Sequence, residues 1–167
     1  QKGTERNVSL GWTGFQNAGS SYEAFEMMKE LHAEGKLAHR VYDAMGFGDS
    51  SARLIAEGAQ IDPTDYLTVR DIKAVMDGAL GSRGAAFIEP YADEDTVGLM
   101  RYTVDQLTPM LIGALKAGIQ VETHAIGDDA NRKVLDAYEV ALNTVPKSER
   151  VVDDPRWRVE HAQNVQP

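Results

Sequence analysis

The sequence predicts an α/β protein with a parallel sheet flanked by helices. Short apolar, strand-like runs alternate with helical segments along the 167 residues. This strand–helix–strand alternation is typical of parallel sheets, whose crossover connections are helical. Capping patterns mark the helix ends: Thr103 and Gln106 form a capping box, and Gly118 follows the same helix as a stop.

The N-terminal half is expected to contain two strands separated by a helix and followed by an irregular crossover: a strand at Ser9–Gln16, a helix from Ser20 to about Glu34, a strand at His39–Met45 and the crossover at Gly46–Asp65. Ser20 with Glu23 reads as the capping box of the helix, and Gly35 as its C-terminal cap. Within the crossover, Ser51–Gly58 could form a short helix.

The C-terminal half is expected to continue the alternation: a strand at Leu67–Met76, a loop at Asp77–Arg101, a helix at Thr103–Ala117, a strand at Ile119–Ala125, a helix from Asp128 to about Asn143 and a strand at Trp157–Ala162. Asp128 is expected to cap the last helix. The loop is unusually long for a compact domain, and loops of that kind are often functional.

Composition excludes several classes of protein. Hydrophobic residues make up 43% and charged residues 26% of the chain, as in an ordinary globular domain. There is no Cys, which excludes disulfides, a thiolate nucleophile and a Cys-based zinc site. The net charge of −9 and the absence of a basic patch argue against a nucleic-acid partner. No stretch approaches the roughly 20 apolar residues of a membrane span, and no signal peptide is visible, so we expect no membrane partner and a cytoplasmic location.

Candidate functional residues lie at the C-terminal ends of the expected strands, where parallel α/β folds gather their chemistry. His124 and His161 are one strand–helix–strand unit apart and should be neighbours in space. Strand alternation places His124 on the polar face of its strand, and Lys73 likewise lies opposite the apolar residues of its own strand. Either histidine could instead be an ordinary hydrogen-bonding residue.

A buried Lys73 would need a partner or a modification. It could be an ion-pair partner of Asp71, Asp77 or Glu122. The two other histidines, His32 in a helix and His39 at the opposite end of a strand, are expected to be structural.

The glycine-rich segment Asp77–Gly84 is a second candidate site. Its glycines could let backbone N–H groups approach an anion, and Arg83 could bind a carboxylate. It matches neither the dinucleotide fingerprint nor the P-loop, and a plain turn is the alternative. Ser82 has no nearby base in the sequence, and Asp93–Asp95 reads as a solvated surface run.

Five segments together resemble a known family. They are Ile72-Lys73, Asp77-Gly-Ala-Leu-Gly-Ser-Arg-Gly-Ala85, Glu89-Pro-Tyr-Ala-Asp93, His124-Ala-Ile-Gly-Asp128 and Val159-Glu-His-Ala-Gln163. In order and spacing they resemble the amidohydrolase superfamily, and most of all its family 3 branch, which contains N-substituted formamide deformylase. The resemblance covers nearly the whole chain.

The resemblance implies a partial (β/α)8 barrel of the TIM type, with about five parallel strands and flanking helices. It implies that residues 1–167 are one segment covering about strands two to six of the barrel. It also implies a divalent metal, usually zinc, with one or two ions in the full-length protein. Lys73, as a carboxylated lysine, His124 and His161 would be metal ligands and catalytic residues, and Asp77, Ser82 and Arg83 would bind a small amide-type substrate.

The sequence also departs from the family pattern. No His-x-His occurs in it, no strand follows His161 to supply the expected final Asp, and Asn17 stands where many relatives carry Asp. We therefore expect the isolated chain to be inactive. We also expect it to self-associate through exposed barrel edges, since unpaired strands invite pairing with another chain.

The sequence is also compatible with two other functions. The chain could be a Schiff-base enzyme that uses Lys73 as its nucleophile. It could also be a non-catalytic α/β module that binds an anion or a partner through the segment Gly78–Gly84.

Overall fold

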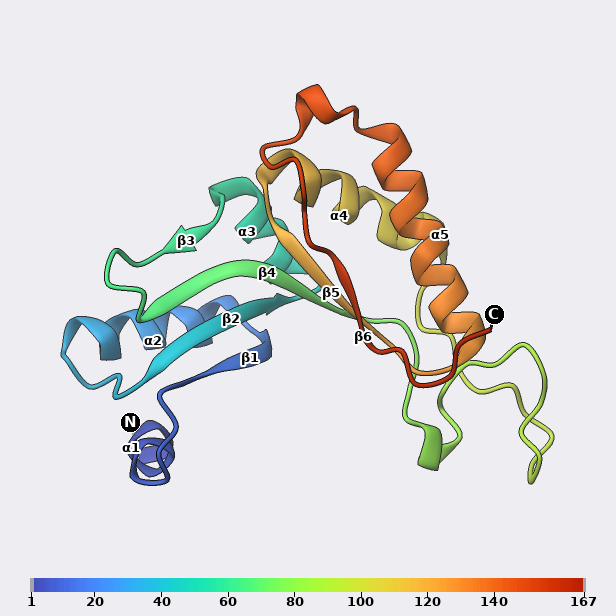
Figure 1. Cartoon of the computed structure of the whole chain (residues 1–167), viewed down its shortest axis with the longest axis horizontal. Coiled ribbons are helices and arrows are strands. Elements are labelled where there is room, and N and C mark those ends of the chain that lie inside the picture. The colour runs from blue at the N-terminus through green and yellow to red at the C-terminus, as the bar shows by residue number, and fades with distance from the viewer. Residues whose placement is uncertain (1, 167) are drawn as a thin grey trace. The chain divides into compact units, whose positions relative to one another are not determined.

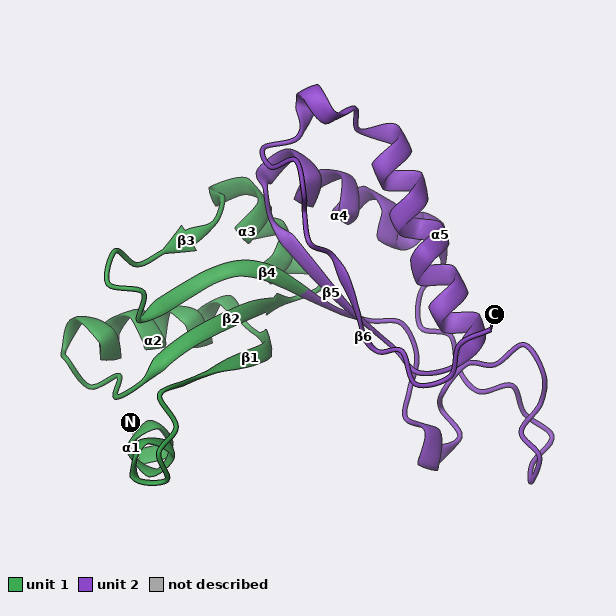
Figure 2. Cartoon of the chain, viewed as in Figure 1, with its two compact units in different colours: residues 1–72 green, residues 73–167 purple. Residues whose placement is uncertain are grey.

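The computed structural model describes residues 2–166. The chain divides into two compact units, residues 1–72 and 73–167 (Figure 2). Strand β4 (Leu67–Val75) crosses the boundary, so its first part belongs to unit 1 and its end to unit 2. Each unit combines strands with helices along the chain (Figure 1).

Unit 1 contains three helices and, besides β4, three strands among its described residues: α1 (Lys2–Ser9), β1 (Gly14–Ser20), α2 (Tyr22–Ala33), β2 (Arg40–Gly46), α3 (Asp49–Glu57) and β3 (Gln60–Ile61). The strand order is β1-β2-β4. β1 runs parallel to β2, with Asn17 opposite Asp43, whereas the two-residue β3 is antiparallel to β4. Fully buried side chains from α2, α3 and β4, among them Phe25, Leu54 and Val69, form the core of this unit.

The N-terminus corrects the predicted strand Ser9–Gln16. Ser9 ends helix α1, and the strand begins only at Gly14. Gly11 explains the difference, because its φ of +87° lies in the left-handed region that a strand cannot contain. The apolar side chains of this stretch, including Trp12, are exposed rather than buried in a sheet.

The predicted capping box of Ser20 and Glu23 is also wrong by one residue. β1 extends to Ser20, whose hydroxyl donates to Asp43 instead. Ser21 caps α2 by accepting a hydrogen bond from the Ala24 backbone N–H at 3.3 Å. Gly35 follows the helix in the left-handed conformation that its expected capping role requires.

The stretch Gly46–Asp65 is more regular than the sequence suggests. Helix α3 begins two residues earlier than the short helix considered for Ser51–Gly58. Ser51 stabilises its start, because its hydroxyl accepts from the Gly48 backbone N–H and donates to the Gly48 carbonyl. The expectation of an irregular crossover is therefore corrected to a helix followed by a short strand.

Unit 2 continues the alternation from the end of β4: a short 3₁₀ turn at Leu80–Ser82, α4 (Val104–Ala117), β5 (Gln120–Ala125), α5 (Asp128–Thr144), a second 3₁₀ turn at Lys147–Glu149 and β6 (Arg158–His161). The strand order is β4-β5-β6, and β5 is parallel to β6. Figure 1 shows α4 and α5 on the same side of β5 and β6. Leu111 of α4, Val134 of α5 and Val121 of β5 are fully buried and belong to the core of this unit.

The cap of α4 is confirmed, and that of α5 is not. Thr103 and Gln106 form the expected capping box, and Gly118 ends α4 with a φ of +69°. Helix α5 begins with Gly127 as its cap instead of Asp128. The Asp128 carboxylate accepts a hydrogen bond from the Ile88 backbone N–H, so it binds the long loop instead of capping the helix.

The α/β class with parallel strands and flanking helices is confirmed. Five of the strands, β1, β2, β4, β5 and β6, follow one another with helices or long connections between them, as in part of a TIM-type barrel. Among residues 2–166 the structure contains no helix that is long and apolar enough to cross a membrane.

Candidate functional site

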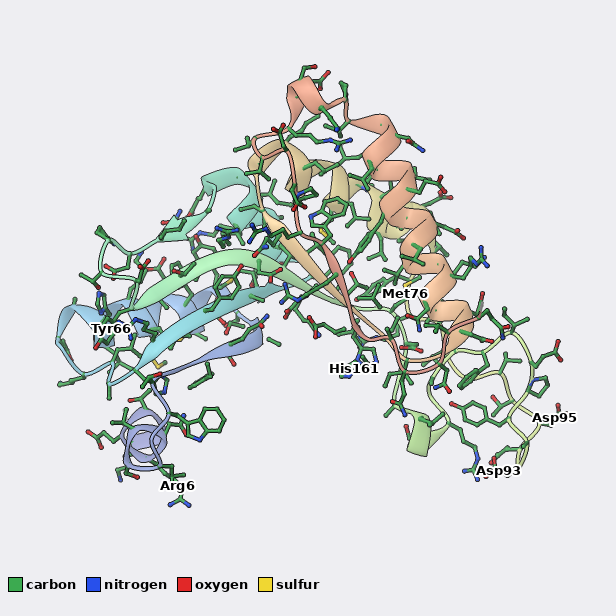
Figure 3. All side chains as sticks on the ribbon, in the orientation of Figure 1. Arg6, Tyr66, Met76, Asp93, Asp95 and His161 are labelled. Carbon is green, nitrogen blue, oxygen red and sulfur yellow. The ribbon has the colours of Figure 1, made fainter. Side chains whose placement is uncertain are left out.

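The two histidines singled out by their spacing lie together at the C-terminal ends of neighbouring strands. His124 is near the end of β5, and His161 is the last residue of β6. Their ring centroids are 4.5 Å apart, with the planes at 75°. The His124 side chain is 16% exposed, and His161 lies open to solvent (Figure 3).

The backbone at His161 makes this pairing of rings possible. In the β5–β6 register His161 lies beside Ala125, whereas His124 lies beside Glu160. Regular alternation would therefore direct the His161 ring to the face opposite His124. His161 instead has a φ of +76° and Ala162 a φ of +43°, so the strand breaks at this point and the ring turns toward His124. Such backbone is strained for residues other than Gly and is concentrated at functional sites.

His124 has the character of a neutral imidazole with an available nitrogen. Its buried Nε2 lies 3.1 Å from Asp77 Oδ1, but the alignment makes no hydrogen bond, and Nε2 has no other hydrogen-bond partner among residues 2–166. Burial is the main reason that the pKa of His124 is lowered; His161 and Lys73 lower it further, while Asp77 and the Gly78 backbone oppose the shift.

Lys73 projects from the end of β4 and is half-buried. It is close enough to His124 to lower the pKa of that histidine. Within residues 73–166 no carboxylate lies at ion-pair distance from its amine. Two of the ion-pair partners considered for it are otherwise engaged: Asp77 accepts from backbone N–H groups, and Glu122 accepts from Arg158.

Asp77 is fully buried and joins the long loop to the start of α5. Its Oδ2 accepts from the backbone N–H groups of Ala86 and Gly127 at 3.0 and 2.8 Å, and its Oδ1 accepts from Ile126 at 3.0 Å. This geometry fits a residue that positions the loop beside His124. Its predicted contact with substrate stays a prediction.

Ser82 and Arg83 lie on the long loop. The Ser82 hydroxyl donates to the Ala79 carbonyl at 3.2 Å. Arg83 Nη2 lies 2.7 Å from Asp93, and Arg83 Nε lies 3.1 Å from Glu94. Two acids of the exposed run, Asp93 and Glu94, are therefore paired, and the hydrogen bond from Arg83 lowers the pKa of Asp93. Figure 3 shows Asp93 and Asp95 at the outer part of this loop, apart from His161, so the loop tip and the histidine pair are separate features.

Three charged residues lie beside the histidines; the sequence suggested no role for Arg158 or Glu160 and considered Glu122 only as an ion-pair partner of Lys73. Arg158 of β6 donates to Glu122 of β5 through Nη2 and to Glu160 through Nε. Glu122 is only 1% exposed. Regular alternation puts Glu122 and His124 on one face, and the register adds Arg158 and Glu160 to it. Alternation along each strand predicts the face on which these side chains lie. The register between β5 and β6, which brings them together, cannot be read from the sequence.

A second polar cluster lies at the ends of β1 and β2 in unit 1. Asp43 is fully buried, and its Oδ1 accepts from the Ser20 hydroxyl at 2.7 Å and from Asn17 Nδ2 at 2.9 Å. Burial raises the pKa of Asp43, although the bonds from Ser20 and Asn17 oppose the shift.

His39 is buried in the same unit, with Nδ1 3.0 Å from the Arg40 carbonyl and its ring against Phe15, as expected for a structural histidine.

The residues present in unit 2 fit part of a metal site. Two imidazoles lie edge to face at adjacent strand ends, and the buried Nε2 of His124 lacks a hydrogen bond. Neutral imidazole nitrogens are ligands that zinc favours. Among residues 2–166 no group of three or more His, Asp or Glu side chains could hold a metal ion, so these residues supply an incomplete set of ligands.

Comparisons with known proteins identify relatives of this chain. The protein LONG AFTER FAR-RED 3 of Arabidopsis thaliana is 39% identical over 105 residues, which cover 62% of this chain and 17% of that protein. The exoenzymes regulatory protein AepA of Pectobacterium carotovorum subsp. carotovorum is 28% identical over 152 residues, or 86% of this chain and 32% of that protein.

A solved structure is similar as well. The crystal structure of an uncharacterized metal-dependent hydrolase from Pyrococcus horikoshii OT3 matches with a TM-score of 0.75 and 28% identity, over 82% of this chain and 28% of that one. The chain thus spans a third or less of each of these relatives. The sequence profile of the amidohydrolase family matches residues 3–167. The chain therefore belongs to the amidohydrolase family.

Proposed function

We propose that this chain is the central part of a metal-dependent hydrolase that acts on non-peptide C–N bonds, such as those of amides, N-formyl groups or cyclic amides. The observation that carries the proposal is the pair of imidazoles at the ends of β5 and β6, with a buried and unbonded Nε2 on His124. The similarity to a solved metal-dependent hydrolase supports it.

In this proposal His124, His161 and Lys73 bind a divalent metal, which we propose is zinc. When bound, the metal supplies a water of lowered pKa and polarises the scissile carbonyl. Burial keeps His124 neutral, so its nitrogen lone pair is available for coordination. Lys73 would add CO₂ to its amine, releasing a proton and leaving a carbamate oxygen as a ligand. A half-buried amine without an ion-pair partner in residues 73–166 suits that modification.

The proposal needs further ligands. The relatives are three or more times longer than the matched region, and the sequence contains no His-x-His. We propose that a longer protein supplies the remaining ligands and the general base, and that residues 1–167 alone bind metal weakly and do not turn over an amide.

Zinc titration against a chromophoric chelator tests this proposal on the chain itself. We expect wild type to bind zinc at neutral pH, and His124→Ala or His161→Ala to weaken binding about tenfold or more. His32→Ala is the matched control, because His32 lies in α2 of unit 1 and contacts Asp62. Equal zinc affinity of wild type and both site variants would contradict the proposed metal centre.

Lys73 can be tested separately. If it is carboxylated, added bicarbonate should raise the zinc affinity of wild type and leave that of Lys73→Arg unchanged. Treatment with a carbonyl compound and borohydride tests the Schiff-base alternative, since only an iminium at Lys73 would add mass. The anion-binding alternative is disfavoured by the ion pairs that Arg83 already makes with Asp93 and Glu94.

A further inference from the structure

A pocket opens among the segments that follow β4, β5 and β6 in unit 2. Its volume is about 290 Å³, and its lining includes Leu80, Phe87, Glu89, Tyr91, Asp128 and Gln166. Asp128 comes four residues after His124, and Gln166 comes five residues after His161. In parallel α/β folds the segments after the strand ends bind substrate, so the pocket lies where a substrate subsite belongs.

Two aromatic rings form one part of the pocket. Phe87 and Tyr91 are arranged edge to face, with centroids 5.0 Å apart. The Tyr91 hydroxyl lies 3.1 Å from the Ala85 carbonyl and donates to it, which fixes the ring. Aromatic faces attract cations through their quadrupole and offer no hydrogen bond to an anion.

The charges around the rings are negative. Glu89 and Asp128 are the charged side chains among the lining residues, and no Lys or Arg belongs to the lining. Burial alone would raise the pKa of Asp128, but hydrogen bonds from Gln166 and the Ile88 backbone lower it, so Asp128 is ionised at neutral pH. The positive charge of Arg83 is close enough to lower the pKa of the Tyr91 hydroxyl, but Arg83 is paired with Asp93 and Glu94.

The loop that carries the rings is held in place before any ligand arrives. The Ala86 carbonyl accepts from the backbone N–H groups of Asp129 and Ala130, and Asp77 holds the Ala86 N–H. A Cβ on Gly127 would lie 1.9 Å from the Ala86 carbonyl oxygen, so the contact is close enough to require glycine. A pocket fixed in this way loses little conformational entropy on binding.

We propose that this pocket binds a compact organic cation, held against the Phe87 and Tyr91 rings and beside the carboxylates of Asp128 and Glu89. The proposal deepens the proposed function and rests on it in one respect: in the hydrolase, the pocket would hold a cationic group of the substrate. It predicts that the enzyme prefers amides that carry an ammonium group over amides that carry a carboxylate.

Three probes of one shape and different charge test the pocket on the full chain. Choline is the cation, 3,3-dimethylbutan-1-ol its neutral analogue and 3,3-dimethylbutanoate an anion of similar size. Titration followed by amide chemical shifts of Phe87–Ala92 should show choline binding at least about fivefold more tightly than the alcohol, with no binding of the anion. Equal binding of choline and the alcohol, or no response to choline, would overturn the proposal.

Variants then assign the recognition. Asp128→Asn and Phe87→Leu should each weaken choline binding about fivefold. Asp105→Asn is the matched control, because it removes the same charge from the first turn of α4, outside the pocket. Glu89→Gln changes an exposed side chain and keeps the test usable if Asp128→Asn unfolds the loop. The readout needs neither zinc nor turnover, so a failed metal centre and a failed cation pocket give different results.

Discussion

Asp77→Ala should destabilise unit 2 more than any substitution of an exposed acid in the same loop. The Asp77 carboxylate is fully buried and accepts hydrogen bonds from three backbone N–H groups, those of Ala86, Ile126 and Gly127. It joins the long loop after β4 to the junction between β5 and α5. Alanine would leave all three donors without their partner.

The size of the effect follows from those three bonds. An unsatisfied buried donor costs about 1–3 kcal/mol, so the loss of three partners should lower the free energy of unfolding by about 4 kcal/mol. Asp77→Asn keeps one oxygen, which can serve Ala86 and Gly127. It turns an amide N–H₂ toward the Ile126 N–H, which then retains only its longer contact of 3.2 Å to the remaining oxygen. That variant should lose about 2 kcal/mol.

Urea unfolding followed by circular dichroism measures both variants. Asp95→Ala is the control, because Asp95 is an exposed acid of the same loop, and we expect its effect to stay within about 0.5 kcal/mol. If Asp77→Ala fails to fold, the asparagine variant still reports the effect. A loss below about 1 kcal/mol for Asp77→Ala would refute the anchoring role of this carboxylate.

Three further predictions follow from single contacts. Gly127→Ala should cost more than about 2 kcal/mol in the same unfolding assay, because its Cβ would meet the Ala86 carbonyl at 1.9 Å; an effect as small as that of Gly81→Ala, which meets nothing within 4 Å, would contradict the close approach. Burial raises the pKa of Asp43 above its unfolded value, so its contribution to stability is present below about pH 4 and is lost as the pH rises through the folded-state pKa. Asp43→Asn should therefore flatten the dependence of the unfolding free energy on pH above about pH 4, and an unchanged slope would count against it. Phe15, 39% exposed on β1 at the end of the strand order of unit 1, should promote self-association, so Phe15→Lys should lower the mass measured by light scattering, and a monomeric wild type would show the idea to be wrong.

Local patterns predicted the elements that depend on local physics. The capping box of Thr103 and Gln106 and the left-handed Gly118 bound helix α4 as expected, because each acts within a few residues of its own position. Five strands and the face of β5 that carries His124 also follow from alternation along the chain. The family resemblance was carried by residue identities and agrees with the match over residues 3–167.

Local patterns failed where a side chain had a choice of partners. Ser20 and Ser21 are chemically identical candidates for the cap of α2, and the nearby carboxylate of Asp43 decides that Ser20 turns away from the helix. Asp128 stands where an N-cap is expected, but it bonds to the Ile88 backbone 40 residues away in sequence. Contacts between residues far apart in the sequence decide which partner each side chain binds, and a short stretch of sequence does not contain those residues.

The sequence by itself thus determined five strands that alternate with helices, the family and the histidines that belong to the candidate site. Only the tertiary structure decided how those histidines meet, because regular alternation would have put His161 on the far face and the left-handed backbone at His161 reverses it. The buried anchoring of Asp77 and the ion pairs of Arg83 were likewise set by packing. The physical reason is the same in each case: spacing along a chain constrains which residues can be neighbours, but the orientation of a side chain depends on backbone conformation and on which partners compete for it.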